Sequence, residues 1–150
     1  MARAMPTYQG TGKPAQAMNI QLTPGHPRLY LTPRELPEFR RKAKTLRRRH
    51  AALLLEQLEP SVRSPLTLRE QVDHSPEYFA LALGQAWRLT RDRKYGRAAE
   101  WLLEAIQPFT ELGSGYDTWG LAAEAVALSY DWLHDYWRAR KMERTVAELA

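Results

Sequence analysis

The four histidines are the first side chains to test for chemistry, because an imidazole can carry a proton or bind a metal near neutral pH. They stand at positions 26, 50, 74 and 134. None of their spacings matches the HExxH or HxxxH patterns of zinc sites, and the chain contains no cysteine. The sequence therefore argues against a zinc site and excludes thiolate ligands and disulfides, and we expect no cofactor.

Acidic residues recur along one stretch, Asp117–Trp137, whose sequence is DTWGLAAEAVALSYDWLHDYW. Gly120, Glu124, Asp131 and Asp135 stand at helical spacing and form one polar strip, which could face a cavity, a ligand groove or the solvent. The stretch is otherwise apolar around nearly its whole circumference. We therefore predict a central helix around which the other helices pack. Its charges interrupt it too often for a membrane span.

Within this stretch, Glu124 and His134 do not share a helix face closely enough to form an acid–base couple. Asp131 and Trp132 are expected to be structural. Asp131 would bind a backbone group or an arginine, because a buried charge needs a partner. Trp132 would fill the core.

The elements that would position these groups are helices. Residues 1–24 are polar and without periodicity, so we expect a flexible arm ahead of a helical domain over 25–150. Thr32 caps the first helix and Glu35 completes a capping box, and the segment from Pro60 to Pro65 ends this helix. One apolar stripe runs along it, and its histidine is expected to be a packing residue: Leu36, Phe39, Ala43, Leu46, His50 and Leu53.

A pair of helices is predicted next. Ser75 caps a helix that begins at Pro76. A short charged turn over 88–94 leads into a helix over about 95–107, which Pro108 closes. Because the connection is so short, the two helices should be antiparallel.

The last segment is amphipathic, with Met142, Val146 and Leu149 on one side, and this apolar side suggests partners outside the chain. No strand pattern occurs beyond the extended lead-in at 25–31, so the predicted fold class is all-α. The first twenty residues contain no apolar region of the kind that signal peptides have.

The charge is +5, with 22 Lys and Arg against 17 Asp and Glu, and much of the excess lies in Arg40–Arg49. A basic balance suits acidic partners such as nucleic acid, anionic lipid or an anionic polysaccharide. The simpler interpretation is a solvated helix face. The segment has no interleaved aromatic residues, which argues against single-stranded nucleic acid.

Three segments, in a fixed order, match a known pattern. HPRLYLTPRELPEFRRKAKT at 26–45 combines an HPRL-type segment with a helix start after TP. AWRLTRDRKYGRAAEWLL at 86–103 has the form of helix, short turn and helix. GLAAEAVALSYDWLHDYW at 120–137 is a helix that reaches a YDWL motif. Together they cover much of Gly25–Leu149 and resemble the N-terminal part of heparinase II/III-like polysaccharide lyases.

That resemblance implies an (α/α) toroid, in which antiparallel helix pairs surround a groove for a sugar chain. It also implies β-elimination at a uronic acid unit. One residue neutralises the carboxylate, and a tyrosine or histidine removes the C5 proton and protonates the leaving oxygen. The family is mostly exported, so the resemblance implies a periplasmic or secreted protein, although no signal peptide is visible.

The family's catalytic residues do not map onto this chain. The resemblance places an Asn/His pair and the catalytic Tyr and His after the YDWL helix, whereas Asn19 is the only asparagine here. We therefore expect an incomplete toroid that is inactive alone, with no catalytic residue in this chain. Its partners would be an anionic polysaccharide, and the remainder of the toroid or a second copy of the chain.

Glycan contact is expected at Tyr116, Asp117 and Trp119, next to the Gly-rich loop FTELGSGY. Such loops wall the groove of a toroid, and aromatic faces stack on sugar rings. In the competing interpretation Trp119 packs the helix end and Tyr116 covers the loop. The loop is too short, and lacks the lysine, for a phosphate-binding loop.

A tetratricopeptide-like module for protein interaction is the alternative. Residues 82–107 partly fit one repeat, with small residues at suitable positions. The next period, about 34 residues on, places Trp132 where the small Ala98 should recur. A third hypothesis, a basic nucleic-acid-binding protein, rests on charge alone.

Overall fold

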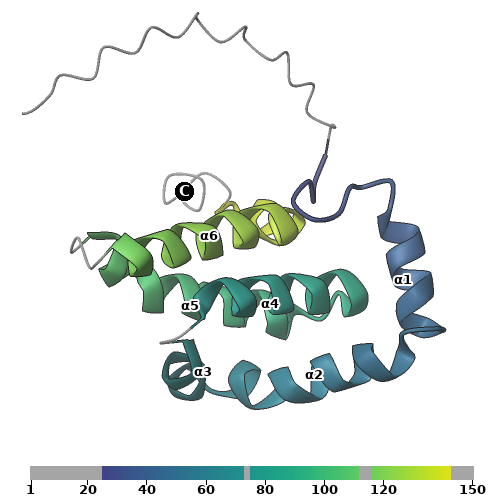
Figure 1. The fold of residues 1–150 in the computed structure, drawn as a ribbon, viewed down its shortest axis with the longest axis horizontal. Helices are drawn as coiled ribbons and strands as arrows, with labels where there is room; N and C mark the ends of the chain where they lie inside the picture. Colours follow the sequence, from purple (N-terminus) through teal and green to yellow (C-terminus); the bar gives the residue numbers. More distant parts are fainter. Residues whose placement is uncertain (1–24, 73–74, 112–115, 143–150) are drawn as a thin grey trace, which may run out of the picture.

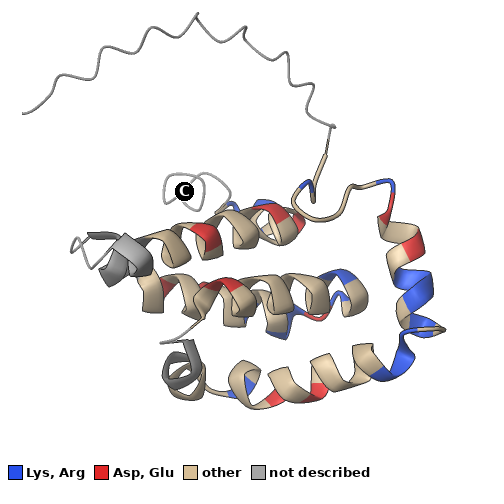
Figure 2. Cartoon of the chain, in the orientation of Figure 1, with Lys and Arg blue, Asp and Glu red and all other residues tan. Residues whose placement is uncertain are grey.

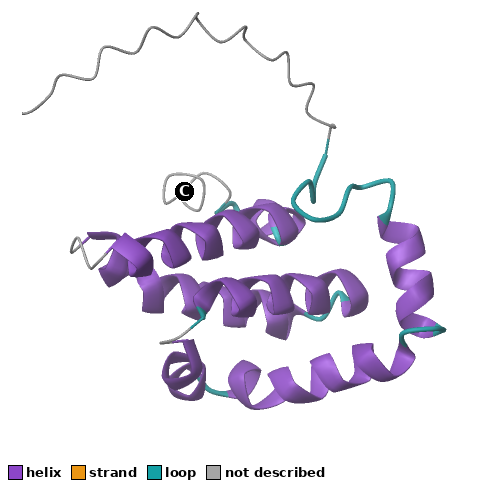
Figure 3. Ribbon diagram, in the orientation of Figure 1, coloured by secondary structure: helices purple, strands orange, loops and turns teal. Residues whose placement is uncertain are grey.

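Every element in the described part of the chain is a helix (Figure 3), which confirms the all-α prediction. The computed structural model describes residues 25–72, 75–111 and 116–142, without side chains at 69–72, 107–111 and 116–119. The predicted arm at 1–24 and the amphipathic segment beyond Met142 fall outside these ranges.

The helices of the described part follow one another with short connections. They are α1 (Leu36–Lys44), α2 (Arg48–Arg63), α3 (Pro65–Val72), α4 (Pro76–Thr90), α5 (Arg93–Glu111), α6 (Tyr116–Trp132) and α7 (His134–Arg140). Figure 1 shows α2, the α4–α5 pair and α6 as roughly parallel rows, with α1 and α3 at opposite ends. The predicted antiparallel pair is confirmed, because α5 returns alongside α4 (Figure 1).

The first predicted helix is in fact two helices, α1 and α2, which meet at a corner (Figure 1). Thr45 leaves the helical conformation with φ −120° and ψ −99°, and the backbone N–H of Arg47 turns back to the carbonyl of Lys42 at 2.8 Å. The single apolar stripe is therefore wrong. Leu46 is 79% exposed at the corner, and His50 is exposed rather than packed.

The helix end predicted between Pro60 and Pro65 is confirmed, because α2 ends at Arg63, whereas the predicted stop at Pro108 is wrong. Pro60 lies inside α2 and Pro108 inside α5. Pro60 is exposed, so water can satisfy the carbonyl that loses its partner. The actual break is Ser64, whose φ −142° and ψ 123° are the extended conformation favoured before a proline, here Pro65. The connector predicted at 61–75 contains α3.

The predicted start of the first helix is partly right. The Glu35 carboxylate accepts hydrogen bonds from the Thr32 backbone N–H and hydroxyl, both at 2.8 Å. This is the carboxylate half of a capping box. Regular helix begins only at Leu36, one turn later than Thr32.

The centre of the packing is α4 rather than the predicted α6. α4 contacts α1, α2, α5 and α6, and its small buried residues, among them Ala80, Gly84 and Ala86, let these helices approach closely. α6 contacts α4, α5 and α7, and it leaves Gly120 and Glu124 exposed. The alanine-rich helix α6 can lie at the edge of the packing, because an alanine methyl group that is only half buried loses little hydrophobic stabilisation.

Two glycines set the approach of the C-terminal helices. A Cβ at Gly84 would lie 2.5 Å from the Cβ of Trp132, so α6 crosses α4 at this point without room for a side chain. A Cβ at Gly96 would collide with the Tyr136 ring. α7 is therefore seated directly on α5.

The basic run surrounds the α1–α2 corner (Figure 2), and the predicted solvated face is confirmed for most of it. Arg41 and Lys42 pair with Glu38 on the helix surface. Four exposed residues have no acidic partner among the described residues: Lys44, Arg47, Arg48 and Arg49. None of the helices in the described ranges is both long and apolar enough to cross a membrane.

Candidate functional site

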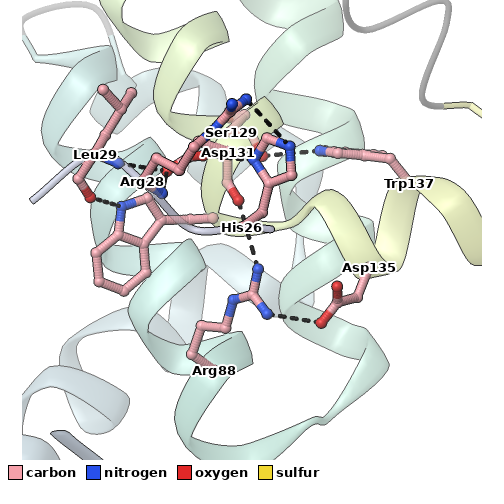
Figure 4. A network of polar contacts seen from close by, with 9 residues as sticks. His26, Arg28, Leu29, Arg88, Ser129, Asp131, Asp135 and Trp137 are labelled. Carbon is pink, nitrogen blue, oxygen red and sulfur yellow. Dashed lines mark hydrogen bonds and ion pairs between the residues drawn. The ribbon is translucent and has the colours of Figure 1, made fainter. Parts of the chain in front are cut away.

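The densest polar network joins the segment His26–Leu29 to the C-terminal end of α6 (Figure 4). One Asp131 oxygen, Oδ1, lies 2.6 Å from His26 Nδ1. The other, Oδ2, accepts the backbone N–H groups of Arg28 at 2.6 Å and Leu29 at 2.7 Å. Asp131 is only 4% exposed, so these three donors replace the water that its charge requires.

Trp132 adds a hydrogen bond in which the α6 residue is the donor rather than the acceptor. Its indole Nε1 donates to the Leu29 carbonyl at 3.0 Å, and its ring meets Phe39 edge-on at 6.1 Å. Two neighbouring residues of α6 thus hold one segment, Asp131 by accepting and Trp132 by donating. We call these contacts the Asp131 clamp.

A buried arginine supports the clamp from α4. Arg88 is 1% exposed, and its Nη1 donates to Asp135 at 2.6 Å while Nη2 lies 3.5 Å from the Asp131 carbonyl (Figure 4). Arg91 also reaches Asp135, at 3.0 Å. Burial raises the pKa of the Asp135 carboxyl, but the bonds and charges of Arg91 and Arg88 outweigh it, so the pKa lies below its usual value. Asp135 therefore neutralises Arg88 at neutral pH.

The turn between α6 and α7 is fixed from inside. Trp137 is fully buried, and its Nε1 donates to the Ser129 carbonyl at 2.8 Å (Figure 4). This bond closes the chain over Leu133, where the two helices separate. The end of α6 that carries Asp131 is consequently held by α4, by α7 and by the N-terminal segment.

The imidazole of His26 is enclosed by aromatic rings. It stacks on His134 at 4.0 Å, and Tyr130 meets both rings edge-on. A histidine hydrogen-bonded to an aspartate is the arrangement of many general bases. Here, however, the Arg28 guanidinium stands 3.4 Å from the other ring nitrogen, Nε2. With Nδ1 held by Asp131 and Nε2 next to a cationic side chain, the contacts of this imidazole hold the chain together.

This histidine pair predicts a pH dependence of stability. Burial lowers the pKa of His134, and the neighbouring His26 lowers it further; Arg138 and Arg88 act in the same direction and Asp135 opposes them. The unfolded chain therefore binds a proton more readily than the folded chain, and stability falls as pH drops through about 6.5. We expect the melting temperature to decrease between about pH 7.5 and pH 5.5, and to decrease less in His134→Phe. An equal decrease in both proteins would contradict this role.

The sequence-predicted site residues lie elsewhere. Tyr116, Asp117 and Trp119 belong to the first turn of α6, and their side chains fall outside the described residues. Asp131 lies 14 residues after Asp117 in the same helix, which corresponds to a distance of roughly 20 Å along the helix axis. The fold does not bring these residues to the clamp, and glycan contact at them stays a prediction.

Sequence reasoning found half of the clamp. The structural role predicted for Asp131, as a partner of backbone groups, and for Trp132, as a core residue, is confirmed. Glu124 is exposed and accepts the Tyr30 hydroxyl at 3.2 Å. The role of His26 was missed, because the extended lead-in has no periodic signal. A cluster of polar groups next to a proline was the only available indication.

The described residues contain no group of three His, Asp or Glu side chains that could hold a metal. No protein-family model matches this sequence, and neither a curated protein nor a solved structure matches it. In its described part, the fold and the site define an all-α protein in which the segment His26–Leu29 is clamped to the C-terminal end of α6.

Proposed function

We propose that this chain is the first part of an (α/α) toroid of a polysaccharide lyase resembling heparinase II/III, acting on uronic-acid-containing polysaccharides. The Asp131 clamp carries the proposal. The HPRL-type segment and the YDWL motif, about a hundred residues apart, hold each other through Asp131 and Trp132. The residues that carry the resemblance are in contact with each other. This favours a structural unit shared with the lyase family over a chance similarity between helical sequences.

An uncovered apolar groove supports the idea of an incomplete ring. A cavity of about 380 Å³ opens between α1, α2 and α4, with Phe39, Ala43, Leu54 and Leu89 among its lining residues. Further apolar side chains of α2, α3 and α4 stand exposed: Leu53, Leu66 and Tyr78. Exposed apolar surface marks an interaction site where it is contiguous. Additional helix pairs of a toroid would cover it.

In this proposal the chain contributes structure and glycan contact, and catalysis belongs to the remainder of the toroid. β-Elimination needs a group that neutralises the uronate carboxylate and a base placed at the C5 proton. The most base-like arrangement described, His26 with Asp131, has the Arg28 guanidinium 3.4 Å from its second ring nitrogen. We therefore expect no lyase activity from this chain alone.

Glycan binding tests the proposal directly. Alginate and heparin oligosaccharides would be titrated into the isotope-labelled chain and followed by NMR. We expect weak binding that is lost in Trp119→Ala and Tyr116→Ala. Tyr78→Ala is the matched control, because Tyr78 is an exposed aromatic residue of α4, 69% accessible, on another helix. Unchanged binding in the first two variants, or no binding of any uronate polymer, would count against the proposal.

The coding DNA beyond codon 150 provides a second test. An in-frame continuation with an Asn-His pair and more helix pairs would support the lyase. A stop codon, together with a stable monomer that binds a peptide, would favour the alternative, a tetratricopeptide-like interaction module. One observation speaks for that alternative: successive helices α4, α5 and α6 alternate in direction (Figure 1), and α4 and α6 approach closely at Gly84.

A further inference from the structure

A polar cavity of about 250 Å³ lies where α7 meets the first half of α5. Its lining consists of charged and hydroxyl-bearing side chains: Arg93, Arg97, Glu100, Tyr136 and Arg140. The three from α5 are four and three residues apart, and the two from α7 are four apart, so each set shares one helix face. We call this site the arginine cavity.

The back wall of the arginine cavity is rigid. Because Gly96 has no side chain, the Tyr136 ring lies directly on α5. The ring is 5% exposed and meets Trp87 and Trp137 edge-on. Burial and the hydrogen bond to Glu100 raise the pKa of Tyr136 to about 12. The phenol thus stays protonated and donates to Glu100 Oε1 at 2.8 Å.

Positive charge in the cavity is only partly neutralised. Glu100 Oε1 also accepts from Arg140 Nε at 3.1 Å, and it is the only acidic partner of that guanidinium among the described residues. Arg93 and Arg97 have no acidic partner in the described part of the chain. Three guanidinium groups thus face one carboxylate, an excess of two positive charges. Planar guanidinium groups bind oxyanions with paired hydrogen bonds and are the preferred donors for phosphate.

We propose that the arginine cavity binds a tetrahedral oxyanion, the phosphate or sulfate group of a ligand, with Arg93, Arg97 and Arg140 as its donors. Glu100 fixes the orientation of Arg140 and at the same time repels the anion. Tyr136, at the back of the cavity, lies in α7, which follows the C-terminal end of α6. Tyr116 is the first residue of α6, and this helix is roughly 24 Å long from Tyr116 to Trp132. This binding site is therefore separate from the proposed glycan contact and does not depend on it.

Calorimetric titration of the full chain with inorganic phosphate and inorganic sulfate, at constant ionic strength, is the first test. We expect saturable binding at one site. Arg97→Gln should weaken it about tenfold, the effect of losing one charge-assisted hydrogen bond. Arg63→Gln is the matched control, because it removes the same charge from an exposed arginine of α2 and should leave binding unchanged. An equal loss in both variants, or no saturable binding, would overturn the proposal.

Glu100→Gln gives a result of opposite sign. The amide can still accept from the Tyr136 hydroxyl but carries no negative charge, so we expect tighter binding of both anions. Unchanged binding would mean that Glu100 does not face the anion, and weaker binding would mean that it does not repel the anion; either result would overturn the site as proposed. Thermal melts of all variants verify that the fold is intact.

Further titrations distinguish a phosphorylated ligand from a sulfated one. A sugar phosphate that binds more tightly than the matching sugar sulfate identifies a phosphorylated ligand, and the reverse order identifies a sulfated one; either supports the proposal. Acetate is the shape control. Three guanidinium groups can each engage a different oxygen of a tetrahedral anion, whereas a carboxylate offers only two. Acetate binding as tight as sulfate would overturn the assigned ligand class.

Discussion

Asp131→Ala is expected to lower the free energy of unfolding by about 3–5 kcal/mol, the range found when a buried charged pair loses one partner. The carboxylate is 4% exposed and binds three donors at 2.6–2.7 Å. Its removal leaves the N–H groups of Arg28 and Leu29 and the His26 ring without an acceptor. Equilibrium urea unfolding measures the loss, and hydrogen exchange at these two amides measures release of the segment.

The control for this experiment is Glu124→Ala. It removes the same charge from the same helix, but Glu124 is exposed and has one hydrogen bond, at 3.2 Å from Tyr30. Surface substitutions of this kind usually change stability by about 0.5 kcal/mol or less. If Asp131→Ala and Glu124→Ala unfold at the same urea concentration, the clamp does not stabilise the fold.

Local signals in the sequence predicted the helix class well. Pro76 at the start of α4 and the short charged turn before α5 were sufficient to predict an antiparallel pair, because both features act within a few residues. The predicted role of Ser75 was less accurate, since its side chain makes no capping bond. At the start of the next helix, α5, the Asp92 carboxylate does act as a cap, because it accepts the backbone N–H of Lys94 at 3.0 Å.

The sequence could not predict features that depend on tertiary contact. Pro108 has the residue type of a helix stop, yet α5 continues through it to Glu111, and no local signal in the sequence predicts this. α4 is the central helix because its small residues let other helices pack closely against several of its faces. Hydrophobicity alone predicted that α6 would be the central helix. The clamp joins residues about a hundred positions apart, and a single sequence contains no signal for such a pairing.

Trp132→Ala is the second large effect. The side chain is 2% exposed, donates to the Leu29 carbonyl and packs on Phe39, and truncation of a buried tryptophan costs about 3–5 kcal/mol. Trp132→Phe retains much of the packing but not the hydrogen bond, so we expect a smaller loss. Urea unfolding of both variants separates the two contributions.

Gly84 and Trp132 should also be strongly coupled. In the wild type, Gly84→Ala places a methyl group 2.5 Å from the Trp132 Cβ, and overpacking of this kind costs about 1–3 kcal/mol. With Trp132→Gly both the Cβ and the indole are gone, so the methyl group at position 84 meets no side chain from position 132. The added alanine then contributes its helix propensity, about 1 kcal/mol over glycine. A double-mutant cycle should show Gly84→Ala destabilising in the wild type and much less so, or stabilising, beside Trp132→Gly. Additive changes would mean that the α4–α6 approach is not set by this contact.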